Sequence, residues 1–125
     1  MEFKDNKAIY LQIADYVSEN IVLGKWSADE KIPSVRELAV ELQVNPNTVA
    51  RTYEHLQNKC VIANKRGIGF SISDDAHVKI KSNLKDRFLS HELPEFFRNI
   101  YLLNISFDEI TERFEDFKIK HYNHK

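Results

Sequence analysis

Residues 33–56 read PSVRELAVELQVNPNTVARTYEHL, and this stretch is the most informative about the fold. Ser34 followed by Glu37 is a capping box, in which each side chain satisfies a free backbone N–H at the start of a helix. Asn45-Pro46 starts a second helix, because asparagine caps helices well and proline suits the first helical position. Two short helices joined by a tight turn form a helix-turn-helix unit.

The second helix of this unit has two different faces. At about 100° per residue, Val49, Tyr53 and Leu56 cluster on one side, which predicts the buried face. Tyr53 is expected in the core, with the alternative that its hydroxyl reaches a DNA phosphate. Donors and acceptors in the first two turns of the opposite face are typical of a recognition helix that enters the major groove. The polar residues of that face are Asn47, Thr48, Arg51 and His55.

The flanking segments predict a winged helix. Upstream, apolar residues recur at helical spacing from Tyr10 to Ile21, and Gly24 fits the left-handed position after a helix. Downstream, residues 61–63 and 70–72 read as two short strands. Between them lies a basic turn with two glycines, residues 64–69, which we call the wing. Its Lys65 and Arg66 suit the minor groove and its flanking phosphates.

Positive charge is concentrated in the same part of the chain. The whole sequence has a formal net charge of −1, but residues 31–66 hold six Lys and Arg against three Glu, a local charge of +3. Arg36 falls in the first turn of its helix, where the helix dipole disfavours a cation. Contact with a DNA phosphate or a guanine would explain an arginine there, and a surface ion pair is the alternative.

From residue 74 onward the sequence predicts a helical tail with much apolar surface. Pro94 marks a helix break or a new helix start, and Ser106 with Glu109 is a second capping box. A solitary stripe of phenylalanines would be an aggregation hazard, so we expect a partner subunit to cover it. A pocket for an apolar effector is the alternative. The residues expected at the dimer interface are Phe88, Phe96, Phe97, Ile100, Phe107, Ile110, Phe114 and Phe117.

The composition argues against several other classes of protein. No apolar run approaches the roughly 20 residues that cross a bilayer, and the N-terminus lacks the layout of a secretion signal, so we expect a cytoplasmic protein with no membrane partner. Cys60 is the single cysteine and no Cys/His spacing fits a zinc site, so we expect neither a metal nor a cofactor. The absence of a carboxylate pair, a nucleophile–base pair and a phosphate loop argues against an enzyme.

Four separated stretches resemble the GntR family of bacterial transcription regulators in order and spacing. They are residues 9–14 (IYLQIA), 32–39 (IPSVRELA), 44–49 (VNPNTV) and 66–70 (RGIGF). The resemblance covers roughly the first 73 residues, and four matches in register are a specific signal. The short helical tail most resembles the YtrA-like subfamily.

The resemblance implies DNA contacts from the Pro-Ser-x-Arg motif, from the start of the recognition helix and from the wing. It also implies a homodimer, held by the C-terminal helices, on a two-fold symmetric operator. Cys60 departs from the pattern, because it stands where the family commonly has glycine; we therefore expect the recognition helix to end without a left-handed cap. The implied DNA-binding residues are Ser34, Arg36, Asn45, Asn47, Thr48, Arg51, Lys65, Arg66 and Gly67.

We therefore predict a mainly α-helical protein with a small β-hairpin. Residues 1–73 form a winged helix-turn-helix DNA-binding domain, and residues 74–125 form a helical dimerisation tail. The predicted function is sequence-specific binding of double-stranded DNA in transcription regulation, as a homodimeric repressor. The alternative is a winged-helix protein-interaction or assembly module without sequence-specific DNA binding. The sequence identifies neither an operator nor a small-molecule effector.

Overall fold

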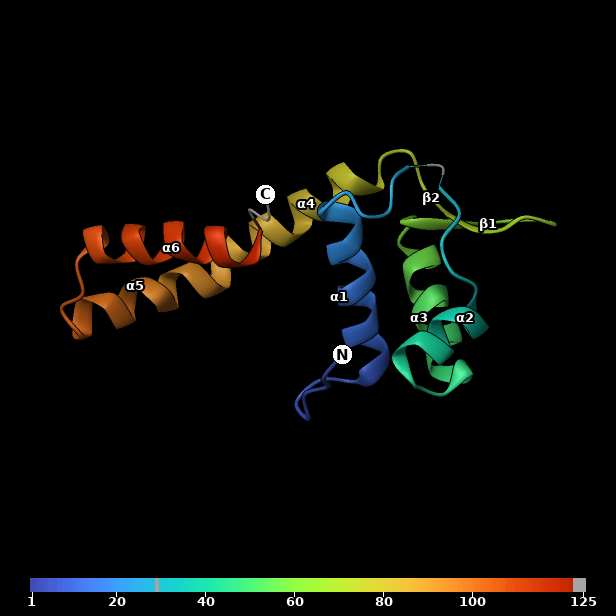
Figure 1. The fold of residues 1–125 in the computed structure, drawn as a ribbon, viewed down its shortest axis with the longest axis horizontal. Coiled ribbons are helices and arrows are strands. Elements are labelled where there is room, and N and C mark those ends of the chain that lie inside the picture. The colour runs from blue at the N-terminus through green and yellow to red at the C-terminus, as the bar shows by residue number, and fades with distance from the viewer. Residues whose placement is uncertain (29, 123–125) are drawn as a thin grey trace. The chain divides into compact units, whose positions relative to one another are not determined.

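The computed structural model describes residues 1–28 and 30–122, and the chain divides into two compact units (Figure 1). The first unit ends at Leu84 and the second begins at Lys85. The prediction of a mainly helical chain with a small hairpin is confirmed. None of the helices in the described ranges combines the length and the apolar character needed to cross a membrane. The elements in chain order are α1 (Ile9–Val22), α2 (Val35–Leu42), α3 (Pro46–Asn58), β1 (Ile62–Lys65), β2 (Gly69–Ile72), α4 (Ala76–Arg87), the π-helical turn η1 (Phe88–Glu92), α5 (Leu93–Leu102) and α6 (Phe107–His121).

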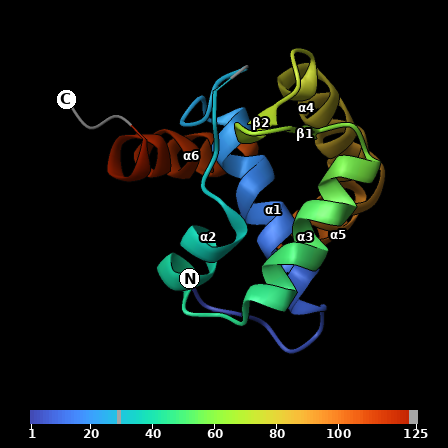
Figure 2. The same ribbon diagram turned by 90° about the vertical axis from the view of Figure 1, so that its right-hand side faces the viewer.

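The core of the first unit forms between α1, α2 and α3. Both α1 and α2 pack against α3 (Figures 1 and 2). Ile13 of α1, Leu38 of α2 and Val49 of α3 are completely buried, as their helical spacing predicts. Each such side chain contributes about 1.5–3 kcal/mol of hydrophobic free energy. The core therefore holds α3 by one face and leaves the opposite face exposed.

The hairpin packs against the same core at the C-terminal end of α3. β1 pairs with β2 in antiparallel register, with Ile62 opposite Ile72, and both side chains are buried. On the other edge of β2, the Ile32 N–H donates to the Phe70 carbonyl at 3.0 Å, so residues 30–32 add a short third segment. Both predicted strands are therefore present, and both reach further toward the tip of the wing than residues 61–63 and 70–72.

Four helices close their last turn with a residue in the left-handed region. In each case the N–H of the following residue reaches the carbonyl five positions back, which is the Schellman arrangement. The expected end of α1 at Gly24 is thereby confirmed. The four left-handed residues are Gly24 (φ 78°), Gln43 (φ 56°), Cys60 (φ 61°) and Asn104 (φ 55°).

The end of α3 contradicts our expectation. Because Cys60 replaces a glycine, we expected no left-handed cap, yet Cys60 adopts that conformation. The Cys60 N–H donates to the Gln57 carbonyl and the Val61 N–H to the Leu56 carbonyl, each at 3.0 Å. Val61 and Leu56 belong to the same buried cluster, so the apolar packing that accompanies this motif offsets the strain of a Cβ atom.

The start of α4 belongs to the first unit. Ala76 and Ile80 are buried in its core, beyond the last strand residue, Ile72. Pro94, expected at a break or a helix start, lies in the first turn of α5. The turn before it is π-helical, with the Leu93 N–H bonded to the carbonyl of Phe88. Proline and π-bulges are both common causes of kinks in helices.

The second unit has almost no core of its own. Among residues 85–122, Ile100 is the only buried one. The rings of Phe97 and Phe107 contact each other near the turn between α5 and α6, with centroids 6.1 Å apart. Away from that turn, α6 lies well to one side of α5 (Figure 2). The two helices therefore leave most of their apolar side chains uncovered.

The second capping box forms only in part. Ser106 Oγ accepts a hydrogen bond from the Glu109 N–H at 3.2 Å, as predicted. The Glu109 carboxylate instead accepts a hydrogen bond from Arg113 Nε at 2.9 Å, one turn along α6. The N-cap of α6 is thus confirmed, whereas the reciprocal bond that we expected is replaced by an ion pair on the helix surface.

The left-handed cap of α3 makes a testable prediction about stability. We expect Cys60→Gly to raise the free energy of unfolding by about 0.5–1 kcal/mol, because removing the Cβ relieves more strain than the extra freedom of the unfolded chain costs. Cys60→Ala is the matched control, since it removes the thiol and keeps the Cβ. Urea denaturation measures both variants. A Cys60→Gly variant no more stable than Cys60→Ala would contradict the prediction.

Candidate nucleic-acid interface

The start of α2 is held by the predicted capping box. Ser34 Oγ accepts a hydrogen bond from the Glu37 N–H at 3.1 Å, and the Glu37 carboxylate accepts one from the Ser34 N–H at 2.9 Å. The bond from the Ser34 backbone holds the pKa of Glu37 below its ordinary value of 4.5. Arg36 lies in the same turn and is exposed, and no carboxylate of residues 1–28 or 30–122 forms an ion pair with it. The cap therefore presents Arg36 to the solvent.

The start of α3 is capped by Asn45. Asn45 Oδ1 accepts a hydrogen bond from the Asn47 N–H at 2.8 Å, and Pro46 occupies the first turn, as predicted. Asn47 is exposed and Thr48 is half-buried. Because the amide oxygen of Asn45 serves the helix cap, its NH₂ group is the end of the side chain that remains to donate to a ligand.

Arg51 is exposed in the second turn of α3, with its guanidinium over an aromatic ring of α1. Arg51 Cζ lies 4.0 Å from the centre of the Tyr10 ring. The same ring meets the His55 imidazole edge-on, with centroids 5.9 Å apart. The sequence gives Tyr10 as a helix-face residue but no sign of these contacts, because they join segments about 40 residues apart.

Tyr53 ties the recognition helix to its two neighbours. Its hydroxyl donates to the Pro33 carbonyl at 2.6 Å, immediately before α2. Its ring meets the Phe70 ring of β2 edge-on at 4.9 Å. The side chain is only 1% exposed and burial raises its pKa, so the hydroxyl stays a proton donor. The expected core position is confirmed, and the alternative of a phosphate contact is wrong because the hydroxyl is buried on Pro33.

The wing presents its cations in a tight turn. The Ile68 N–H donates to the Lys65 carbonyl at 2.9 Å, and Gly67 between them has a φ of 78°, which suits glycine. Lys65, Arg66 and Gly67 are all exposed. Sequence reasoning overlooked Ile68, which is 58% exposed beside these cations. An exposed β-branched residue at a hairpin tip is the signal that could have identified it.

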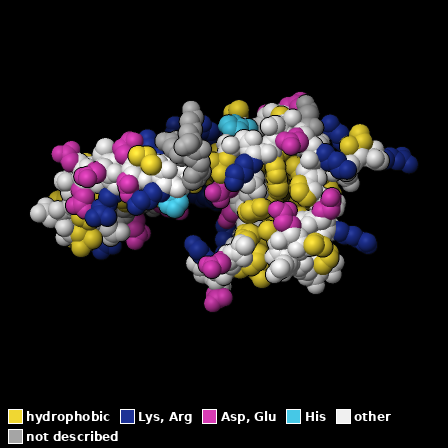
Figure 3. Space-filling view, in the orientation of Figure 1, with side chains coloured by type: hydrophobic (Ala, Val, Ile, Leu, Met, Phe, Trp, Pro, Cys, Tyr) yellow, Lys and Arg dark blue, Asp and Glu magenta, His cyan; other side chains and the backbone are white. Residues whose placement is uncertain are grey.

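Positive side chains gather where these elements meet the solvent. Figure 3 shows Lys and Arg side chains standing out from the edge of the first unit that carries the wing and α2. Helix α2 and the two cations of the wing belong to residues 31–66, which carry a local charge of +3. A surface of this kind attracts the phosphate backbone of DNA.

The predicted dimer residues form the apolar surface of the second unit. Ile100 is buried and Ile110 is half-buried, while the six phenylalanines remain exposed. A hollow of about 610 Å³ lies at the turn between α5 and α6, lined in part by Phe97, Tyr101 and Phe107. Sequence reasoning overlooked two exposed residues at the end of α5, Leu102 and Leu103.

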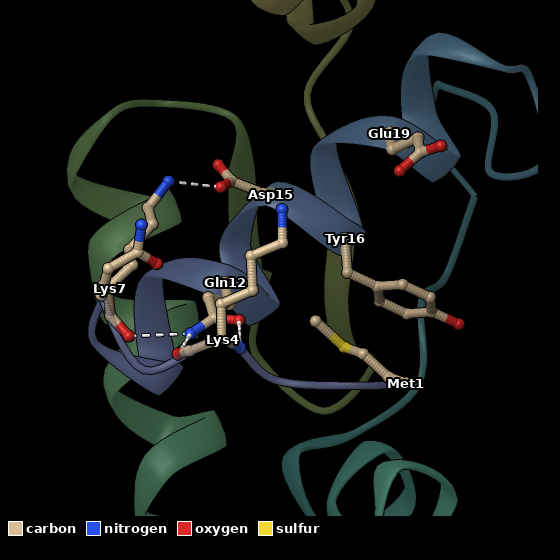
Figure 4. A pocket seen from close by; sticks show the side chains of 8 residues that line it. Met1, Lys4, Lys7, Gln12, Asp15, Tyr16 and Glu19 are labelled. Atoms are coloured by element: carbon tan, nitrogen blue, oxygen red, sulfur yellow. Dashed lines mark hydrogen bonds and ion pairs between the residues drawn. The ribbon is translucent and has the colours of Figure 1, made fainter.

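A second hollow, of about 510 Å³, lies between the N-terminal arm (residues 1–8) and α1 (Figure 4). The buried Gln12 amide closes it on one side, accepting from the Lys4 N–H at 2.8 Å and donating to the Lys4 and Lys7 carbonyls at 2.7 Å each. Lys7 also pairs with Asp15. The hydrogen bonds of the Gln12 side chain therefore hold the arm against the helix.

Comparison with known proteins places this geometry among DNA-binding regulators. Residues 9–72 match the family model described as "Bacterial regulatory proteins, gntR family". The uncharacterized HTH-type transcriptional regulator YhcF of Bacillus subtilis (strain 168) is 34% identical over 116 residues, which are 93% of this chain and 94% of the relative. The HTH-type transcriptional repressor YtrA of the same organism is 28% identical over 109 residues, 87% of this chain and 83% of the relative.

A solved structure shares the fold. The crystal structure of a protein from Bacteroides thetaiotaomicron, assigned as a transcriptional regulator of the GntR family, is 48% identical in sequence with a TM-score of 0.65. The match covers 90% of this chain and 98% of the other. It therefore includes the helical segments after the hairpin as well as the winged helix.

The capping box makes α2 sensitive to acid. The lowered pKa means that Glu37 stabilises the folded state fully above pH 4.5, and that this contribution is lost as the pH falls through the folded pKa. We expect the difference in unfolding free energy between wild type and Glu37→Gln to shrink between about pH 6 and about pH 3. Glu41→Gln, in the last turn of α2, controls for the loss of one charge. A difference in unfolding free energy between wild type and Glu37→Gln that does not change with pH would contradict the prediction.

Proposed function

The chain belongs to the GntR family of bacterial regulatory proteins as a DNA-binding transcription regulator of the YtrA-like group, and from this premise we propose that it acts as a homodimeric repressor. Members of this family are transcription regulators, not enzymes. The observation that carries the proposal is the exposed polar face of α3, fixed by a buried opposite face and flanked by Arg36 and the wing. We place its action in the cytoplasm, where operator DNA lies.

In this proposal α3 reads bases and the other elements hold the DNA backbone. Asn47, Thr48 and Arg51 lie in the first two turns of α3, which is the part of a recognition helix that meets base edges in the major groove. The arginine fork can bind guanine through two hydrogen bonds. Exposed groups around α3 contact the phosphates and the minor groove. These groups belong to Ser34, Arg36, Asn45, Lys65, Arg66 and Gly67.

The second unit supplies the argument for a dimer. It has about 40 residues, and units of that size usually need oligomerisation, disulfides or metals to fold. Its described part buries Ile100 alone and exposes a phenylalanine stripe along α6, with Phe107, Phe114 and Phe117 each 47–58% exposed. Ion pairs such as Arg113–Glu109 flank this stripe and are suited to solvent. A second copy of the same stripe is the partner that would complete this core.

A dimer of this kind fits a two-fold symmetric operator. Its two α3 helices would enter successive major grooves, with half-sites about one helical turn apart. Occupation of promoter DNA would then block transcription. The repressor named YtrA, which resembles this chain over most of both lengths, supports repression rather than activation.

Selection of bound sequences from random duplex DNA, at fixed near-physiological salt, tests the proposal. We expect recovery of an inverted repeat. On that operator, Arg51→Ala should lose about 1–3 kcal/mol and relax one base position, whereas Lys65→Ala should weaken all sequences alike. Equal losses on operator and random DNA for Arg51→Ala would contradict its base contact. A folded dimer that recovers no sequence above background would favour the protein-interaction alternative.

The dimer has a separate test in solution. We expect the wild-type chain to sediment as a dimer at micromolar concentration and Phe114→Asp to sediment as a monomer, because a carboxylate in a desolvated apolar interface costs several kcal/mol. Glu112→Gln, on the opposite side of α6, is the matched control and should remain dimeric. A wild-type chain that stays monomeric at these concentrations would refute the proposed interface.

A further inference from the structure

An arginine, a tyrosine and a histidine lie together on the flank of α3 that faces α1. The Arg51 guanidinium sits over the Tyr10 ring, with Cζ 4.0 Å from its centre. The edge-on contact with His55 places the same ring against the next turn of α3. One side chain of α1 therefore touches two successive turns of the recognition helix.

The position of Tyr10 is fixed from within the protein. Thr52, the residue after Arg51, is completely buried, and its Oγ1 donates to the Tyr10 carbonyl at 2.8 Å. Tyr10 itself is half-buried. Two residues further along α1, the side chain of Gln12 holds the N-terminal arm. The first turn of α1 is thus immobilised beside Arg51 before any DNA is present.

The contact with the Tyr10 ring leaves the N–H donors of Arg51 available. A guanidinium over an aromatic ring is attracted by the electrons of its face, and this interaction needs no hydrogen-bond acceptor. Within residues 1–28 and 30–122, neither a carboxylate nor a carbonyl accepts a hydrogen bond from this group. The ring therefore restricts the side chain without using the donors that a guanine or a phosphate would need.

We propose that Tyr10 is a positioning residue for DNA recognition, which holds the Arg51 guanidinium in place for its contact with the operator. This inference rests on the proposed function, since it takes Arg51 as a base-reading residue. By this mechanism α1, which makes no base contact, contributes to sequence specificity. Ordering a long side chain before binding removes part of the entropy cost of the complex.

The test compares Tyr10→Leu and Tyr10→Phe in the wild-type and Arg51→Ala backgrounds. Dissociation constants are measured on the selected operator and on random duplex DNA at one salt concentration. We expect Tyr10→Leu to weaken operator binding about threefold to tenfold, the size of a cation–π contact, with little change on random DNA. Tyr10→Phe keeps the aromatic face and should bind as the wild type does. In the Arg51→Ala background, Tyr10→Leu should have no further effect.

The outcomes separate this proposal from the proposed function. A loss in Tyr10→Leu that persists in the Arg51→Ala background, or tighter operator binding by Tyr10→Leu, overturns the role of Tyr10 alone. Equal loss on operator and random DNA for Arg51→Ala overturns the base contact itself. Nuclear magnetic resonance of the free protein provides a readout without DNA. The Arg51 δ-methylene signals should carry a ring-current shift in wild type and Tyr10→Phe, and their lack of such a shift overturns the proposal.

Discussion

The hydrogen bond from the buried Tyr53 hydroxyl to the Pro33 carbonyl fixes the arrangement on which the rest of the first unit depends. A buried hydroxyl without a partner costs free energy, so orientations of α3 that break this hydrogen bond are disfavoured. The same ring contacts Phe70 of β2. A single side chain therefore sets the positions of the recognition helix, the start of α2 and the wing relative to one another.

Much of this structure could be predicted because its signals are local. The capping box of α2, the Asn45 cap of α3 and the glycine end of α1 each involve residues a few positions apart, where sequence spacing determines geometry. The apolar spacing of α3 likewise identified its buried and exposed faces. The candidate DNA-binding residues lie in or beside such local elements, and all of them except the half-buried Thr48 are exposed.

What could not be predicted depends on contacts between distant segments or on competition between partners. Cys60 adopts the glycine conformation because Leu56 and Val61 are buried around it, which no local rule reveals. The contact between Tyr10 and Arg51 requires α1 to pack against α3. Glu109 had two possible partners one turn apart, and the arginine competed successfully with the backbone.

The nearly coreless second unit has a consequence for how such a regulator would respond to its own abundance. In the proposed dimer, most of the apolar packing of this unit forms only when two chains meet, so folding of the unit and association are one event. At low abundance, the amount of the paired form rises with roughly the square of the number of chains. A modest change in synthesis or degradation would then produce a steeper change in promoter occupancy, with no ligand required.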